Sequence, residues 1–113
     1  MGTIRLYDLL RRRALITRES AATLRQALDS AVGADGELVV DFAEVDAVTP
    51  SFIDELLALI EDAARRAGRP GLRALFLNAP TRLSAKFVAI GKGHGTRMVE
   101  TGTNSWEITL PAA

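Results

Sequence analysis

The sequence contains no cysteine, one histidine and no excess of either charge. Without cysteine the chain can form no disulfide, thiolate nucleophile or Cys-ligated zinc site. A single histidine, His94, gives a catalytic triad or a His-rich metal centre little to build on. The 14 basic and 14 acidic residues cancel, which argues against a broad nucleic-acid-binding surface. We therefore expect no enzyme activity, no metal and no cofactor.

Long apolar runs are also missing. No stretch approaches the roughly 20 apolar residues that span a bilayer, and the first residues do not follow the signal-peptide pattern. The 113 residues, 48% hydrophobic and 25% charged, have the composition of one ordinary globular domain. We expect a single domain over residues 1–113, located in the cytoplasm, where proteins without disulfides are usual. The arginine run at 11–13 is expected to be a solvated turn, with contact to phosphate or RNA as the alternative.

Short apolar segments alternate along the chain with segments of helical periodicity. Strands are predicted near residues 3–9, 37–42, 72–77 and 105–110, with 14–16 as a possible hairpin partner of the first, and helices near 18–32, 51–67 and 81–90. The alternation indicates right-handed crossovers and an α/β fold with a mixed, mostly parallel sheet of 4–5 strands and about three helices. The glycine-rich segment around His94 is expected to be a flexible surface loop.

The stretch from Asp41 to Ile60, DFAEVDAVTPSFIDELLALI, is the most informative. A buried strand ends in an acid, and a short loop then leads to a long apolar helix. Thr49 could cap this helix with Pro50 at its first position. Alternatively Ser51 could cap it, with Asp54 three residues later as in a capping box. In either case the helix N–H groups face the end of the sheet, which makes an anion-tolerant corner with hydroxyl groups.

The residues of this corner allow more than one interpretation. Thr49 and Ser51 can be helix caps and nothing more. They can also belong to a recognition surface that a phosphate switches, since a phosphate adds about −1.5 to −2 charges. Four nearby acids could in principle form a metal site, but two of them, Asp54 and Glu55, fit the first helical turn as partners of the helix dipole. The four acids are Asp41, Asp46, Asp54 and Glu55.

The same stretch resembles the central strand–loop–helix of STAS domains, the fold of bacterial anti-sigma factor antagonists. It is closer still to a STAS-like family of unknown function, whose pattern runs roughly DF..V....pSF.DEL. Upstream residues resemble that family's sR..A..L helix, and the resemblance covers about residues 16–90. The matching positions are Thr17, Arg18, Ala21, Leu24, Asp41, Phe42, Val45, Pro50, Ser51, Phe52, Asp54, Glu55 and Leu56.

The resemblance implies a role in bacterial partner-switching signalling. Such a protein docks on a histidine-kinase-like ATPase, and phosphorylation of a hydroxyl at the helix N-terminus ends the docking. Regulatory STAS proteins carry roughly Asp-Ser-Ser-Gly at this place, where the present chain has Thr49, Pro50 and Ser51 in the first three positions. Because proline cannot be phosphorylated, Ser51 or Thr49 would have to substitute, or the protein binds without a switch.

We therefore predict a non-enzymatic adaptor with a protein partner. A second copy of the chain is a further candidate partner. The predicted contact or modification residues are Thr49, Ser51, Phe52, Asp54, Glu55 and Asn78, with Phe52 as an aromatic anchor. The alternative prediction is a small-molecule or nucleotide sensor that uses the helix N-terminus at Pro50–Phe52 as an anion site.

Overall fold

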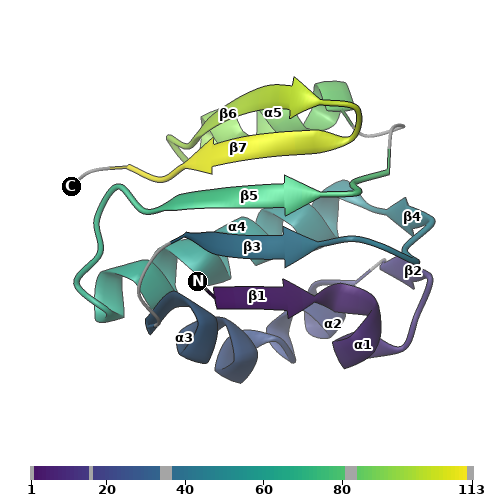
Figure 1. Cartoon of the computed structure of the whole chain (residues 1–113), viewed down its shortest axis with the longest axis horizontal. Helices are drawn as coiled ribbons and strands as arrows, with labels where there is room; N and C mark the ends of the chain where they lie inside the picture. Colours follow the sequence, from purple (N-terminus) through teal and green to yellow (C-terminus); the bar gives the residue numbers. More distant parts are fainter. Residues whose placement is uncertain (1, 16, 34–36, 81–83, 112–113) are drawn as a thin grey trace.

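The computed structural model describes residues 2–15, 17–33, 37–80 and 84–111. A five-stranded sheet runs through the molecule in the order β1-β3-β5-β7-β6 (Figure 1). The parallel strands are β1 (Gly2–Arg5), β3 (Leu38–Asp41) and β5 (Arg73–Leu77). They are followed by the antiparallel strands β7 (Ser105–Thr109) and β6 (Arg97–Gly102). The predicted α/β class with a mixed sheet is confirmed.

Helices α4 (Pro50–Arg66) and α5 (Ser84–Gly93) cover one face of the sheet (Figure 1). Helix α3 (Arg25–Gly33) packs against α4 and the edge strand β1. Between sheet and helices lies a core in which four aromatic rings contact one another in series. They are Phe42, Phe76, Phe87 and Trp106. No helix in the described ranges is long and apolar enough to cross a membrane.

The predicted hairpin near the start of the chain is wrong. After β1 the chain forms helix α1 (Leu6–Leu10), and Arg11 ends it in the left-handed conformation. Leu6 and Leu10 are four residues apart, so one side of a helix turns both toward the core. Strand β2 (Ala14–Leu15) then pairs in parallel with β4 (Ala47–Val48) in a separate two-stranded sheet.

The single helix predicted over 18–32 is divided into α2 (Arg18–Ala22) and α3. At the junction the Thr23 hydroxyl donates to the Ser20 carbonyl, and the Leu24 N–H donates to the Ala21 carbonyl three residues back. This local hydrogen bonding tightens the backbone and interrupts the regular ladder of the helix.

The C-terminal part differs from prediction in two places. Residues 91–93, expected in a loop, form the last turn of α5, and β6 was not predicted. The sequence did not indicate strand β6, because this edge strand is largely exposed and its apolar residues do not alternate regularly. The other predicted strands and the helix at 51–67 agree with β3, β5, β7 and α4 to within one residue or two. The predicted start of the third helix, at 81–83, lies outside the described residues.

Candidate functional site

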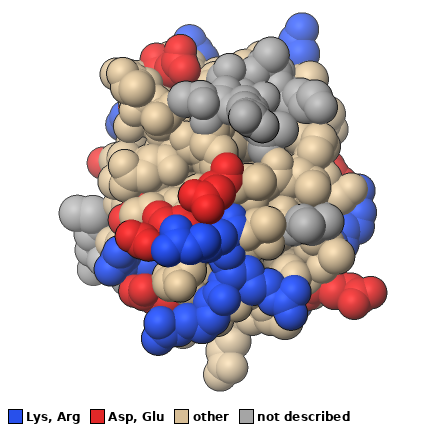
Figure 2. All heavy atoms as spheres, turned by 90° about the vertical axis from the view of Figure 1, so that its right-hand side faces the viewer, with Lys and Arg blue, Asp and Glu red and all other residues tan. Residues whose placement is uncertain are grey.

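The carboxyl ends of β1, β3 and β5 meet the start of α4 at one end of the molecule. We call this end the strand-end corner and define it by Arg5, Arg11–Arg13, Asp41, Thr49–Glu55 and Asn78. Ligands and partners of open α/β sheets commonly bind at this edge. Figure 2 looks onto this end of the molecule and shows a band of Lys and Arg side chains with Asp and Glu beside it.

Backbone hydrogen bonds hold the corner together. The Thr49 N–H donates to the Leu15 carbonyl at 3.0 Å, and the Asp46 N–H donates to the Arg13 carbonyl at 2.7 Å. Together with the β2–β4 pairing, these bonds place the arginine run directly beside the loop that leads into α4. The start of α4 is therefore a fixed surface and not a free loop end.

Thr49 is the N-cap of α4. Its side-chain oxygen accepts a hydrogen bond from the Phe52 N–H at 3.2 Å, and Pro50 occupies the first helical position. This is the first of the two caps that the sequence allowed. The alternative cap at Ser51 is not formed, since Ser51 is already the second residue of the helix, where it is exposed.

Phe52 cannot act as the predicted partner anchor, because its side chain is fully buried. With the helix beginning at Pro50, Phe52 lies on the same side as Leu56 and Ile60, one and two turns later, and all three contribute to the core. Phe52, predicted as an interface residue, therefore stabilises the fold.

Asn78, one of the predicted contact residues, lies at the strand-end corner, where its side chain is bonded to the end of the neighbouring strand. Its side-chain amide donates to Asp41 Oδ1 at 2.9 Å, and the same oxygen accepts from the Ala43 N–H at 2.9 Å. Arg5 approaches the other Asp41 oxygen at 3.8 Å. Asn78 has a φ of 57°, a left-handed conformation that asparagine tolerates better than most residues. These contacts join the ends of three strands.

Asp54 lies on the outer side of α4 and is separate from the Asp41 group. Its Oδ2 accepts from Arg18 at 2.7 Å, and its Oδ1 is 2.7 Å from His94 Nε2. The hydrogen bond from Arg18 and then that from His94 lower the pKa of Asp54, against a smaller opposing effect of burial. Glu55 is half-buried. In the parts of the chain that the structure describes, no three His, Asp or Glu side chains are grouped to hold a metal ion.

The prediction that His94 lies in a flexible surface loop is wrong. Its side chain is only 16% exposed, and its Nδ1 lies 3.0 Å from Glu61 Oε2. Burial lowers the pKa of His94, but the hydrogen bonds and negative charges of Glu61 and Asp54 outweigh it and raise the pKa above its ordinary value. Glu61 and Asp54 lie 33 and 40 residues before His94 in the sequence. The residues around His94 therefore gave no indication of these contacts. The only available signal was the spacing of the two acids, which lie seven residues apart on one side of a helix.

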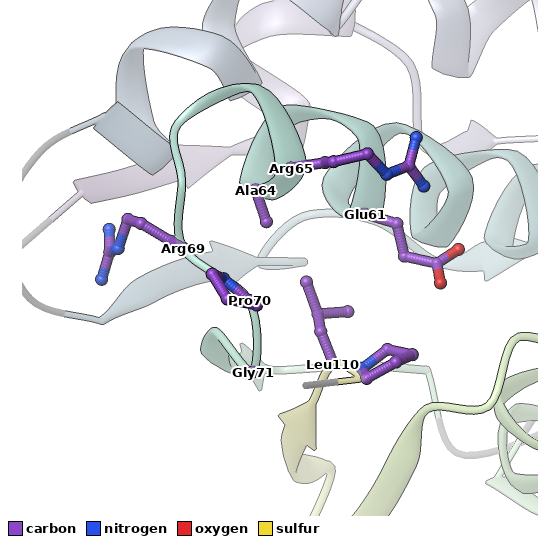
Figure 3. A pocket seen from close by; sticks show the side chains of 8 residues that line it. Glu61, Ala64, Arg65, Arg69, Pro70, Gly71 and Leu110 are labelled. Carbon is purple, nitrogen blue, oxygen red and sulfur yellow. The ribbon is translucent and has the colours of Figure 1, made fainter. Parts of the chain in front are cut away.

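Glu61 also lines a small cleft between the second half of α4, the following loop and the two residues after β7 (Figure 3). The cleft has a volume of about 150 Å³. Sites for small molecules usually measure about 300–1,000 Å³, so this cleft is too small for a nucleotide.

No family model, curated protein or solved structure matches the chain.

Proposed function

We propose that the chain is a non-enzymatic protein-interaction module that docks on its partner through the strand-end corner. The observation that carries the proposal is the position of Ser51, which is exposed at the second residue of α4 within a surface fixed by backbone hydrogen bonds. A rigid, exposed surface loses little freedom on binding, which favours association.

The arginine run, which lies beside the loop before α4, supplies the docking chemistry of the corner. Arg11 and Arg12 are exposed, and Arg13 is held 3.3 Å from Glu44 and lies over the Tyr7 ring at 5.6 Å. Leu9, at the end of α1, adds an exposed apolar side chain. Arginine and tyrosine are enriched in protein interfaces. The surface therefore suits a partner with acidic groups around a small apolar patch.

The proposed class of partner follows from the sequence resemblance. The geometry favours Ser51 over Thr49 as the hydroxyl that the partner would phosphorylate. A histidine-kinase-like ATPase that phosphorylates its docked partner needs an exposed acceptor. Thr49 uses its side-chain oxygen to cap the helix, whereas Ser51 is exposed. A phosphate on Ser51 would lie within one turn of Asp54 and Glu55, and the added negative charge would weaken docking by an acidic partner.

The alternative of an anion or nucleotide sensor at the start of α4 has less support. The Thr49 side chain binds the Phe52 N–H, the Thr49 carbonyl binds the Ile53 N–H, and Pro50 has no N–H to offer. Most of the donors of the first turn are thus unavailable to an anion.

A pull-down from the native cell tests the proposal, with the tagged full-length chain as bait. We expect it to capture a histidine-kinase-like ATPase. Ser51→Asp should weaken this binding at least about tenfold, which corresponds to about 1.4 kcal/mol. Ser30→Asp is the matched control, because Ser30 is an exposed serine on α3. The proposal is wrong if no such ATPase binds, or if Ser51→Asp and Ser30→Asp behave alike.

A further inference from the structure

His94 is held between two carboxylates. Nε2 of its ring is 2.7 Å from Asp54 Oδ1, and Nδ1 is 3.0 Å from Glu61 Oε2. A neutral imidazole has one N–H group and can donate only one hydrogen bond, whereas the protonated ring donates two. Ionised carboxylates accept and cannot donate. The geometry therefore suits the imidazolium form, in which both contacts are charge-assisted hydrogen bonds.

The backbone around His94 forms a compact turn that includes the last residues of α5 and leads into β6, and we call it the α5–β6 turn (Gly91–Thr96). The N–H groups of His94 and Thr96 both donate to the Gly91 carbonyl, at 3.0 and 2.8 Å. The Gly95 N–H donates to the Lys92 carbonyl at 3.1 Å, and Gly95 has a φ of 69°. The His94 ring links this turn to α4. A cation directly after α5 is also favoured by the negative end of the helix dipole.

We propose that His94 is a proton-operated clamp that ties the α5–β6 turn to the outer side of α4 when its ring is charged and loosens the turn when its ring is neutral. Loss of the proton leaves one ring nitrogen with a lone pair facing a carboxylate oxygen. That pairing is repulsive, so one of the two contacts must open.

The surrounding charges indicate which contact opens. On α2, Arg18 binds Oδ2 of Asp54 at 2.7 Å, so Asp54 keeps a cation when His94 becomes neutral. Within the described ranges Glu61 has no ion pair other than that with His94.

Cations are also present on the elements around Glu61 and His94. Figure 3 shows Arg65 extending beside Glu61 from α4, and Arg65 is 3.5 Å from Asp62. Lys92 lies within the turn, Arg97 directly follows it, and both are exposed. Because Asp54 keeps Arg18 and Glu61 has no other ion pair, the single N–H of the neutral ring should stay with Glu61, and we expect the Asp54 contact to open.

The pH at which the clamp opens follows from the balance of effects on His94. Burial lowers the pKa of the ring, but the two carboxylates outweigh it, so the pKa lies above the ordinary value of 6.5. The clamp is accordingly closed in mildly acidic solution and opens as the pH rises through the pKa of the folded chain.

The test combines two measurements on the 113-residue chain. Because the chain has one histidine, a proton NMR titration of the imidazole reports on His94 alone. Amide hydrogen exchange of the α5–β6 turn is followed from about pH 5 to pH 9 in the unmodified chain and in His94→Gln. At each pH the ratio of the two exchange rates removes the intrinsic pH dependence of exchange.

We expect a titration midpoint above 6.5. The turn should exchange roughly tenfold more slowly in the unmodified chain than in His94→Gln at about pH 5.5, a factor that corresponds to about 1.4 kcal/mol. The ratio should approach one at about pH 9. Glu61→Gln should lower the midpoint. Asp62→Asn is the matched control, since Asp62 pairs with arginines and should leave the midpoint unchanged.

Two results would overturn the clamp. One is a midpoint at or below 6.5, and the other is an exchange ratio that stays constant while the ring titrates. If His94→Gln fails to fold, the same comparison with Glu61→Gln decides the question. These results do not depend on partner docking, so the clamp and the proposed function can fail separately.

Discussion

The two sides of α4 are held by different forces. The inner side consists of large apolar side chains that are fully buried against the sheet: Phe52, Ile53, Leu56, Leu57 and Ile60. The outer side carries three acids, each paired with a cation from another segment. Asp54 binds Arg18 and His94, Glu61 binds His94, and Asp62 binds Arg25.

The contacts on the two sides differ in their contribution to stability and in their dependence on pH. Burial of each large apolar side chain contributes about 1.5–3 kcal/mol and does not depend on pH. Partly exposed ion pairs contribute about 0–1 kcal/mol each. Pairs with arginine keep their charge across the accessible pH range, but a pair with histidine does not. Most of the stability of α4 therefore comes from its inner side, and pH dependence enters on its outer side through His94.

The largest effect is expected from Phe52→Ala on the inner side. Removing a fully buried aromatic side chain typically lowers the free energy of unfolding by about 3–5 kcal/mol, and we expect the same loss at pH 6 and pH 9. Urea unfolding at both pH values measures it. A loss below about 1 kcal/mol would mean that Phe52 is not a core residue, and its role as a partner anchor would need to be considered again.

A smaller and pH-dependent effect is expected from Asp54→Asn on the outer side. This change removes the acceptor of two charge-assisted hydrogen bonds. Because the Asp54 side chain is 42% exposed, we expect a loss of about 1–2 kcal/mol at pH 6. Urea unfolding measures the loss, with Asp62→Asn as the control, since Asp62 pairs only with arginines among the described residues.

The sign of the pH dependence follows from the two pKa shifts. The pKa of His94 is raised from 6.5, so its stabilising contribution is complete below 6.5 and is lost as the pH rises through the folded value. The pKa of Asp54 is lowered from 3.8, so its contribution is present above 3.8 and is lost as the pH falls through the folded value. The effect of Asp54→Asn should thus shrink between pH 6 and pH 9, while that of Asp62→Asn stays constant. Equal behaviour of the two variants would contradict the assignment of His94.

The smallest effect is expected from the two hydroxyls at the start of α4, which also differ from each other. Thr49→Ala removes a helix cap and should cost about 1 kcal/mol. Ser51→Ala changes an exposed residue and should stay within about 0.5 kcal/mol. Thermal or urea unfolding of the two variants distinguishes the structural hydroxyl from the one that is left for a partner. A larger loss for Ser51→Ala than for Thr49→Ala would place the cap at Ser51.

Prediction from sequence succeeded where the pattern was strong and local. The apolar periodicity after Pro50 is that of α4, and the β-branched run at 37–42 is that of β3. Thr49 was one of two possible caps, and only the observed hydrogen bond to Phe52 decided between them. Phe52 belongs to the broad apolar face of the predicted helix and was also proposed as a partner anchor, and the structure shows that it is buried.

Prediction failed where distant segments determine the local structure. Ala14–Leu15 pairs with a strand more than thirty residues later, and β6 depends on its pairing with β7. Neither segment has enough local apolar pattern to be recognised alone. Local periodicity describes one element at a time and carries no information about its neighbours in space.

The sequence by itself determined the α/β class, the central strands, the course of α4 and the polar residues at its start, because these depend on periodicity and capping within a few residues. Only the tertiary structure decided that Phe52 is buried, that Ser51 is exposed and that His94 lies between Asp54 and Glu61. The physical reason is that burial and the protonation of an imidazole depend on side chains which the fold brings from distant parts of the chain.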